Sequence, residues 1–339
     1  MQTTAATNPD SVTAKRGKVS FVTGANGKTG KELIKMLLKR GDTVHALVKR
    51  KEYILQLPPG VIPFLGDIND MNVLKDACRG VDNVYHLAAI VSEYQAGTEE
   101  IMRVNVEGTH NIMEACAFAN VKHVIFLSSL DVYGHSRKEL LTEDSKLEPR
   151  DRYGLSKVLA EKEVMKYKDI VPFTIFRVAQ IYGPGFEHYF FKFFKVIKEQ
   201  KAYIIGDGKN ELNLIHVEDA LHAMILASST EVSRYKIYNL TDGKAYSQIQ
   251  LFHFAADILK VPRPSRHISR FIVGFVAKQR GIDSDELRFL TSNRHVDTTK
   301  IQKELGFSSR VSLEDGAGEF VKQFLDQGTK ETFKIGSVF

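Results

Sequence analysis

A tyrosine and a lysine four residues apart, Tyr153 and Lys157, are the side chains of this sequence best suited to proton transfer. On a helix this spacing places the phenol and the ammonium on one face. The ammonium favours the phenolate and therefore lowers the pKa of the phenol. Ser129 precedes them at the end of a predicted strand, where ligands bind in open α/β sheets. We expect Tyr153 to exchange a proton with a substrate oxygen, Lys157 to assist it, and Ser129 to hydrogen-bond that oxygen.

A glycine-rich segment, residues 23–30 (TGANGKTG), lies between a Val- and Phe-rich strand and an amphipathic helix. Glycines allow a tight turn and close approach of phosphate, and the helix N-terminus offers free N–H groups and a positive dipole end. In another context the motif would be an ordinary turn; here it predicts a dinucleotide pyrophosphate site. Its predicted ligands are Gly24, Asn26, Gly27, Lys28, Thr29 and Gly30. Loop and Tyr–Lys pair together predict hydride transfer with a nicotinamide cofactor.

The end of the second strand selects between the two nicotinamide cofactors. The strand at 43–48 is followed by Lys49 and Arg50 and by no carboxylate. Two cations suit the 2′-phosphate of NADP, whereas an acidic residue would bind the ribose of NAD. NADP is therefore the first expectation and NAD the alternative, in which the cations are a solvated pair. After the third strand, Asp67 and Ile68 are expected at the adenine, with a loop cap as the alternative role of Asp67.

The apolar pattern predicts strands that alternate with helices. Strands are expected at 18–23, 43–48, 62–65, 83–87, 124–127 and 173–177, and helices at 31–40, 71–78, 101–120 and 153–168. This alternation predicts an α/β fold with a doubly wound, Rossmann-type parallel sheet.

After residue 182 the pattern changes, which predicts a smaller and less regular α+β region for the substrate. The expected divisions are a disordered tail (1–17), a dinucleotide-binding domain (18–182), a substrate region (183–330) and a C-terminal tail (331–339). Short apolar segments at 215–217 and 237–240 indicate that the substrate region interleaves with the sheet. The aromatic stretch at 189–194 is interpreted as core or dimer contact, with an apolar substrate pocket as the alternative.

Composition argues against several other classes of protein. The net charge of +6 comes without a run of five basic residues, so nucleic acid is not an expected partner. Cys78 and Cys116 lie in no CxxC or Cys/His cluster, which predicts no metal site and fits a reducing cytoplasm. The longest apolar run, 271–277, is far short of the ~20 residues that span a membrane.

Several further segments match one family in chain order. They are YHLAA at 85–89, NVEGT at 105–109, SSLDVYG at 128–134, YGPG at 182–185 and HVED at 216–219. With the glycine loop and the Tyr–Lys pair, residues 18–325 resemble the extended short-chain dehydrogenase/reductases, the NAD-dependent epimerase/dehydratase family. The resemblance implies that Ser129, and not Ser128, is catalytic.

The resemblance also implies roles for residues that spacing alone does not single out. It places Leu87, Ala88 and Ala89 beside the cofactor, together with Tyr153 and Lys157. His86 is expected to line the pocket and Asn105 and Arg177 to support it, with none of these three carrying a proton. A homodimer through helices 101–120 and 153–168 follows from the family's habit.

Departures from the family pattern bear on the reaction. Nucleotide-sugar members usually carry an arginine for the diphosphate where this chain has Leu212, and an asparagine where it has Gln180. Dehydratases place an acidic residue beside the catalytic serine, where Leu130 stands here. The basic end of the second strand is similar to 3β-hydroxysteroid dehydrogenases and dihydroflavonol reductases.

These features predict an NAD(P)-dependent oxidoreductase acting on a secondary alcohol or ketone. The first alternative is a nucleotide-sugar epimerase or dehydratase with tightly bound NAD, in which Lys209 would have to contact the diphosphate. The second is a protein that binds NADP as a sensor without turnover.

Overall fold

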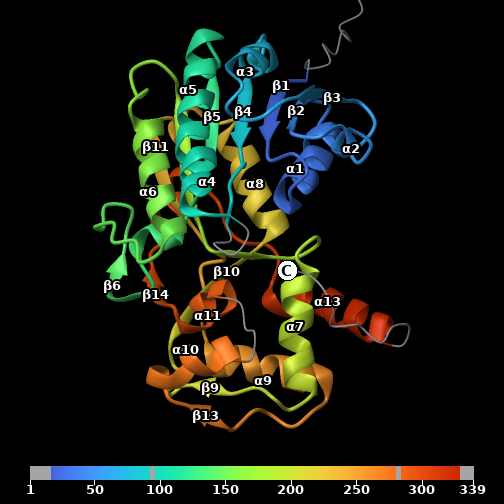
Figure 1. The fold of residues 1–339 in the computed structure, drawn as a ribbon, viewed down its shortest axis with the longest axis vertical. Coiled ribbons are helices and arrows are strands. Elements are labelled where there is room, and N and C mark those ends of the chain that lie inside the picture. The colour runs from blue at the N-terminus through green and yellow to red at the C-terminus, as the bar shows by residue number, and fades with distance from the viewer. Residues whose placement is uncertain (1–16, 92–95, 280–283, 329–339) are drawn as a thin grey trace, which may run out of the picture.

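A seven-stranded, all-parallel sheet forms the centre of the structure, a computed structural model that describes residues 17–91, 96–279 and 284–328. The strand order is β11-β7-β5-β4-β1-β2-β3 (Figure 1). The expected tails, 1–17 and 331–339, lie outside the described residues except for Gly17. The architecture confirms the predicted α/β fold with a doubly wound parallel sheet.

The strands and their connecting helices alternate along the chain as the apolar pattern predicts. The strands of the sheet are β1 (Val19–Thr23), β2 (Thr43–Val48), β3 (Val61–Leu65), β4 (Asn83–His86), β5 (His123–Ser129), β7 (Phe173–Val178) and β11 (Lys236–Leu240). The helices around it are α1 (Lys28–Lys39), α2 (Lys51–Ile54), α3 (Met71–Cys78), α4 (Thr98–Met102), α5 (Gly108–Phe118), α6 (Arg152–Met165), α8 (Val217–Ala227) and α12 (Thr299–Leu305).

Each central strand is apolar on both faces, because helices cover the sheet on both sides. Successive residues of one strand enter different cores: Val22 packs with α1 and α8, whereas its neighbour Phe21 packs with α3 and α5. The same alternation separates Tyr85 from Val84 in β4. Burial on both faces explains why these strands appear in the sequence as short continuous apolar runs.

The chain reverses direction across the sheet between β1 and β4. From β1 it proceeds through β2 and β3 toward one edge, and then from β4 through β5, β7 and β11 toward the other. In open parallel sheets the ligand crevice lies at the carboxyl ends of the strands at such a switch point. We therefore expect the site where β1 and β4 end.

A smaller lobe follows and has its own apolar core, formed by α7, β10, α9 and α13 around Phe194, Leu212 and Phe252. Its elements are β8 (Gln180–Tyr182), α7 (Glu187–Lys198), β9 (Ile204–Ile205), β10 (Glu211–His216), β12 (Ala245–Ser247), α9 (Gln248–Leu259), β13 (His267–Ile268), α10 (Arg270–Gln279), α11 (Ser284–Thr291) and α13 (Leu313–Gly328). A further two-stranded pair joins β6 (Ser136–Leu141) to β14 (Asn293–Val296). Between these segments the chain returns to the large sheet as α8 and β11.

The longest predicted helix, 101–120, differs from its prediction in the middle. It is divided into α4, a π-helical segment at Arg103–Glu107, and α5. The hydroxyl of Thr109, in α5, donates to the carbonyl of Asn105, in the π-helical segment, at 2.6 Å. π-Helical turns inside α-helices occur frequently at functional sites. The helix predicted at 153–168 begins at Arg152 and ends at Met165.

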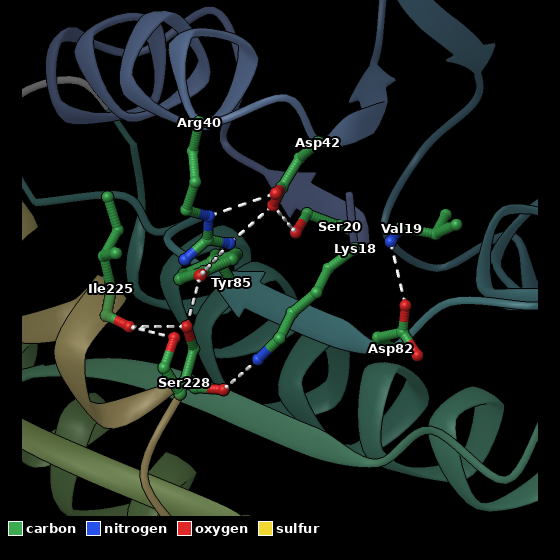
Figure 2. Close-up of polar contacts among 10 residues, drawn as sticks. Lys18, Val19, Ser20, Arg40, Asp42, Asp82, Tyr85, Ile225 and Ser228 are labelled. Atoms are coloured by element: carbon green, nitrogen blue, oxygen red, sulfur yellow. Dashed lines mark hydrogen bonds and ion pairs between the residues drawn. The ribbon is translucent and has the colours of Figure 1, made fainter. Parts of the chain in front are cut away.

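At the amino-terminal ends of the strands, called the amino edge of the sheet, polar side chains bind one another (Figure 2). Asp42 receives hydrogen bonds from Ser20 at 2.7 Å and from Arg40 Nε at 3.0 Å. The hydroxyl of Tyr85 donates to Ser228 Oγ at 2.8 Å, which fastens β4 to the end of α8. This edge is therefore closed by side-chain contacts and lies at the opposite end of the strands from the expected site.

Candidate active site

The glycine loop joins the end of β1 to the start of α1 in a path that needs glycine at two positions. Gly24 has a φ of +68°, and a Cβ there would lie 2.8 Å from the backbone nitrogen of Ala88. A Cβ on Gly30 would lie 2.2 Å from the carbonyl oxygen of Gly24. Gly27 caps α1 without a side chain, so the first N–H groups of the helix face outward from the loop. This cradle fits a pyrophosphate.

The segment after β4 packs against the same loop. The backbone N–H of Ala88 donates to the hydroxyl of Thr23 at 3.2 Å. Leu87 and Ala88 provide the backbone atoms nearest to Gly24. The structure thus brings the predicted cofactor residues 87–89 and 24–30 together at the switch point of the sheet.

The ends of β2 and β3 hold a cluster of charges. Lys49 Nζ lies 2.9 Å from Asp67 Oδ2, and Arg103 Nη1 lies 3.1 Å from Asp67 Oδ1. Although partial burial raises the pKa of Asp67, the hydrogen bonds from Lys49, Asn69 and Arg103 lower it well below its usual range. Arg50 is exposed beside this cluster. Lys49 would therefore share its charge between Asp67 and any phosphate that binds here.

Ile68 differs from the other predicted cofactor residues. Its side chain is buried in the core between the sheet and α3 and α5. It contacts α5 so closely that a Cβ on Gly108 would lie 2.9 Å from Ile68 Cγ2. Only the backbone of Ile68 is left to face a cofactor.

The two serines at the end of β5 have different surroundings. Ser128 is buried and donates to the Glu161 carboxylate at 2.6 Å. Ser129 is 8% exposed, and its Oγ accepts a hydrogen bond from the N–H of Asp131 at 3.1 Å. Because Ser128 is hydrogen-bonded to a buried carboxylate, Ser129 is the more accessible of the two serines.

The start of α6 is pressed against the turn that follows Ser129. Asp151 caps the helix by accepting from the N–H of Gly154 at 2.6 Å. A Cβ on Gly154 would lie 2.7 Å from the carbonyl oxygen of Asp131. The absence of a side chain at Gly154 therefore allows the first turn of α6, which carries Tyr153, to approach the turn after Ser129.

Lys157 is buried beneath Tyr153 and has a defined position. Its Nζ donates to the carbonyl oxygen of Leu127 at 2.7 Å and lies 4.8 Å from the centre of the Phe126 ring. Lys157 is only 3% exposed. Burial lowers its pKa to about 8, although the nearby Glu161 carboxylate acts in the opposite direction. Tyr153, Lys157 and Ser129 thus surround the carboxyl end of β5.

Asn105 connects the loop after β4 to α6. Its Oδ1 accepts from the N–H of Ile90 at 2.8 Å, and its Nδ2 donates to the carbonyl of Ile90 at 2.9 Å. The same Nδ2 donates to Ser156 Oγ at 2.9 Å, and Ser156 in turn donates to the carbonyl of Tyr153 at 2.7 Å. Its amide thus fixes the loop after β4 relative to α6.

His86 lies in a buried chain of hydrogen bonds between β1 and α5. Its Nδ1 lies 2.8 Å from Thr23 Oγ1 and its Nε2 2.9 Å from Thr109 Oγ1. Because Thr109 donates to a carbonyl, it accepts from Nε2–H, which leaves Nδ1 to accept from Thr23. Burial, and then the charge of Lys157, lowers the pKa of His86 to about 3. The imidazole is therefore neutral, and its two hydrogen bonds join the end of β1 to α5.

A buried ion pair between Arg177 of β7 and Glu161 of α6 stabilises the elements that carry the candidate site. Arg177 Nη2 lies 2.8 Å from Glu161 Oε2, and Arg177 Nη1 donates to the hydroxyl of Tyr133 at 2.8 Å. Tyr133 then donates to Asn239 Oδ1 at 2.7 Å, on β11. Arg177 is thus a structural residue that joins α6 and the segment after β5 to the edge of the sheet.

A second cluster, which no sequence pattern indicates, lies beside the candidate site. Arg294, from β14, lies 2.5 Å from Asp131 Oδ1 and donates through Nε to the carbonyl of Gly134 at 2.6 Å. His135 adjoins both Arg294 and Asp151, with its Nε2 2.7 Å from Asp151 Oδ2. The cluster fixes the turn after Ser129 and the start of α6 together. Its members are too far apart in sequence for any spacing rule.

Two segments predicted for the substrate region are structural where the chain is described. Asp219 of the HVED motif accepts from the backbone N–H groups of Arg310 and Val311 at 3.1 and 3.0 Å. Within the aromatic stretch, Phe193 and Phe194 pack on Phe252 and Phe324 at centroid distances of 5.4 and 5.8 Å. This agrees with the core interpretation for these two rings.

Among the described residues, no group of three or more His, Cys, Asp or Glu side chains is placed to hold a metal ion. No described helix combines the length and apolar character needed to cross a bilayer.

Known proteins share both the sequence pattern and the fold. The sequence profile of the NAD dependent epimerase/dehydratase family matches residues 20–241. A UDP-N-acetyl-alpha-D-glucosaminuronate decarboxylase of Bacillus cytotoxicus is 29% identical over 91% of this chain and 98% of its own length. Sterol demethylase protein B of Methylococcus capsulatus is 26% identical over 89% and 98%. The solved structure of MoeE5 in complex with UDP-glucose and NAD is 26% identical, with a TM-score of 0.73 over 91% of this chain and 99% of that one.

Proposed function

Because the chain belongs to the NAD-dependent epimerase/dehydratase family, we propose that it is an NAD(P)-dependent oxidoreductase of secondary alcohols and ketones. The observation that carries this proposal is the meeting of three elements at one strand end. The turn after Ser129, the first turn of α6 with Tyr153, and the buried Lys157 are held together by Asp151, Gly154 and Leu127.

The cofactor is assigned to the cradle between β1 and α1. The pyrophosphate would lie on the backbone of Gly24, Asn26, Gly27, Lys28, Thr29 and Gly30, with the segment 87–89 beside the loop. Lys157 would hold the nicotinamide ribose, and Asp67 with the backbone of Ile68 would lie at the adenine. When bound, the nicotinamide supplies or accepts the hydride.

The protein side chains handle the substrate oxygen and its proton. Tyr153 gives a proton to the oxygen of a ketone, or removes one from an alcohol. Ser129 donates a hydrogen bond to the same oxygen and stabilises the charge that develops on it. The ammonium of Lys157 favours the tyrosinate, and its contact with the Leu127 carbonyl fixes its position.

NADP is the proposed physiological cofactor. The end of β2 offers Lys49 and Arg50 and no carboxylate, which suits a 2′-phosphate. Lys49 is already paired with Asp67, so Arg50 is assigned the main contact with the phosphate. NAD is the alternative, since MoeE5 has been solved with NAD.

The proposed substrate is a ketone or alcohol without a nucleotide diphosphate. Leu212 occupies the position at which nucleotide-sugar members usually carry an arginine, and it is fully buried in the core of the smaller lobe. A buried leucine offers no donor to a phosphate. The sterol demethylase protein is a relative whose name indicates a substrate of this apolar kind.

A second candidate is a nucleotide-sugar epimerase or decarboxylase. It is favoured by the 29% identity to the UDP-sugar decarboxylase over nearly the whole of both chains. Lys209 is exposed on the turn before β10 and is the cation assigned to the diphosphate in this reading. A non-catalytic NADP sensor is the third reading, and it would keep Ser129, Tyr153 and Lys157 without use.

Calorimetric titration with NADPH and NADH, after a check for copurified cofactor by absorbance, is the deciding experiment. We expect tighter binding of NADPH to cofactor-free protein, and Arg50→Ala to weaken NADPH about tenfold or more without changing NADH. Glu52→Gln, a nearby exposed position, is the control for general charge effects. Tightly retained NAD with weak NADPH binding would instead favour the nucleotide-sugar reading.

A panel of substrates then separates the three activities. Oxidation of NADPH by apolar ketones, abolished in Tyr153→Phe, is the expected result. Conversion of a UDP-sugar without net consumption of cofactor identifies the second candidate. Cofactor binding with no turnover of either class, unchanged in Tyr153→Phe, identifies the sensor.

A further inference from the structure

The most exposed large apolar side chain of the described residues lies on the smaller lobe, at the start of α10. Phe271 is 99% exposed and its neighbour Ile272 is 52% exposed. A Cβ added at Gly274, one turn further on, would meet no atom within 4 Å. An aromatic ring and the helix surface beside it are therefore uncovered, an arrangement that usually marks an interaction site when it occurs with other apolar groups.

Phe271 and Ile272 directly follow a segment whose backbone is hydrogen-bonded to β9. The backbone before α10 forms β13 and pairs with β9: Ile204 donates to the carbonyl of Arg266 and Gly206 to that of Ile268, each at 2.8 Å. His267 Nδ1 lies 2.8 Å from the carbonyl of Gly206. The start of α10 is therefore held at a fixed place, and Phe271 is presented outward by it.

Three arginines lie close to Phe271 in the sequence. Arg263, Arg266 and Arg270 all have exposed side chains within eight residues of Phe271. Arg263 is paired with Asp257 at 2.7 Å, and Arg270 lies 3.8 Å from Asp207, a long contact. Arg266 forms no ion pair with any described residue. The sequence of α10 contains no aspartate or glutamate. The surface formed by Arg263, Arg266, Arg270, Phe271 and Ile272 is called the basic apolar pole below.

The pole lies at one end of the molecule. Figure 1 places β13 and α10 at the lower end of the long axis, on the far side of the smaller lobe from the seven-stranded sheet. Cations beside exposed aromatic and aliphatic side chains are typical of proteins that rest on a lipid surface. Arginine also binds phosphate through its planar fork of donors.

We propose that the basic apolar pole docks on a bilayer surface that contains anionic lipids. Phe271 and Ile272 enter the boundary between headgroups and acyl chains, while Arg266 and Arg270 bind lipid phosphates. Anionic lipid is chosen over a second copy of the chain because the three arginines outnumber the two aspartates that contact them, Asp257 and Asp207. Two identical poles placed face to face would therefore bring like charges together. The docking does not depend on the proposed reaction, and it holds for either substrate class.

The absence of tryptophan from the chain makes a direct measurement possible. Phe271→Trp introduces a single reporter at the pole, and Phe118→Trp introduces the matched control on α5, where Phe118 is 59% exposed. With vesicles of phosphatidylcholine and phosphatidylglycerol, we expect a blue shift and quenching by brominated lipid for the first variant only. Neither variant should respond to phosphatidylcholine alone, and added salt should reverse the response.

Sedimentation with the same vesicles tests the side chains themselves. We expect Phe271→Ser to reduce binding about tenfold and Arg266→Gln about fivefold, while Phe118→Ser leaves it unchanged. Equal binding of the Phe271→Ser variant and the wild type, or no binding to anionic vesicles, overturns the proposal. A wild-type dimer that Phe271→Ser converts to a monomer, without vesicle binding, would assign the pole to a second copy and overturn it as well.

Discussion

The carboxyl-terminal and amino-terminal ends of the strands, here called the carboxyl and amino edges of the seven-stranded sheet, carry similar residue types in different arrangements. At the amino edge, Tyr85 bonds the side chain of Ser228, and Asp42 bonds those of Ser20 and Arg40 (Figure 2). At the carboxyl edge, the Asn105 amide bonds both backbone groups of Ile90. This contact with backbone fixes the course of the loop after β4, which carries residues expected beside the cofactor.

Each edge also contains a lysine and a tyrosine whose surroundings differ. Lys18, at the amino edge, donates to the carbonyl of Ser228, and partial burial followed by the charge of Arg40 lowers its pKa. Lys157 is more deeply buried, and its pKa is lowered to about 8. Residue type alone therefore does not identify the site. The candidate site rests on the position of Tyr153 and Lys157 near the strand ends that meet the glycine loop.

The largest expected difference between the edges is in turnover. Tyr153→Phe removes the proton donor, and we expect kcat to fall by about 10²–10⁴-fold with cofactor binding retained. Tyr85→Phe removes a hydroxyl of the same kind at the amino edge, and kcat should stay within twofold, ~0.4 kcal/mol. Steady-state kinetics on any substrate found in the panel decide the matter. Equal losses in both variants would contradict the assignment of the carboxyl edge as the active site.

The buried ion pair beneath the carboxyl edge should dominate stability. Glu161→Gln leaves the Arg177 guanidinium buried without its counter-charge, and we expect the free energy of unfolding to fall by about 3–5 kcal/mol. Glu32→Gln, which breaks the exposed pair with Lys35, should leave the denaturant midpoint unchanged. A small loss in Glu161→Gln would show that the pair contributes little despite its burial.

The pH dependence of Lys157 should affect binding and stability in opposite directions. Its pKa in the folded chain is about 8 and its ordinary value is 10.5, because burial disfavours the ammonium. As pH rises through about 8, the ammonium is lost, and we expect nicotinamide cofactor binding to weaken up to about tenfold per pH unit. Between pH 8 and 10.5 the unfolded chain binds more protons, so this group's contribution to stability rises with pH.

Calorimetry and denaturant titration across this range distinguish the two effects. In Lys157→Met the change in cofactor affinity near pH 8 should be absent. Parallel loss of affinity and of stability in the wild type would mean that unfolding, and not deprotonation of Lys157, causes the weaker binding.

The smallest effect concerns the amino edge alone. Tyr85→Phe removes the hydrogen bond to Ser228, and we expect a loss of about 1 kcal/mol in the free energy of unfolding. Chemical denaturation of Tyr85→Phe, Ser228→Ala and the double variant gives the coupling energy between the two groups. A coupling near zero would mean that this contact adds nothing to the closure of the edge.

The sequence predicted those parts of the site that depend on local geometry. The glycine loop was recognisable because Gly24 and Gly30 must lack side chains where strand and helix meet. Tyr153 and Lys157 were recognisable because one helix sets their spacing. The alternation of strands and helices sufficed for the fold class, since two covered faces require continuous apolar runs.

Other features depend on contacts between distant segments. Arg294 and Asp131 are 163 residues apart, and they meet because β14 pairs with β6 and bonds β10. The burial of Ile68 depends on the approach of Gly108, and the Lys49–Asp67 pair on the spacing of two strand ends. The π-helical segment was missed because its apolar pattern is that of the surrounding α-helix.

The return of the chain to the large sheet has a consequence for its synthesis. β7 ends at Val178, but its outer edge is unpaired until β11, which begins at Lys236, has been made. During that interval β8, α7, β9, β10 and α8 leave the ribosome. An open edge of this apolar strand is a site where nascent chains can pair with one another. The nascent chain is therefore most exposed to such pairing before Leu240 emerges from the ribosome. A fragment that stops at residue 182 would keep that edge open permanently.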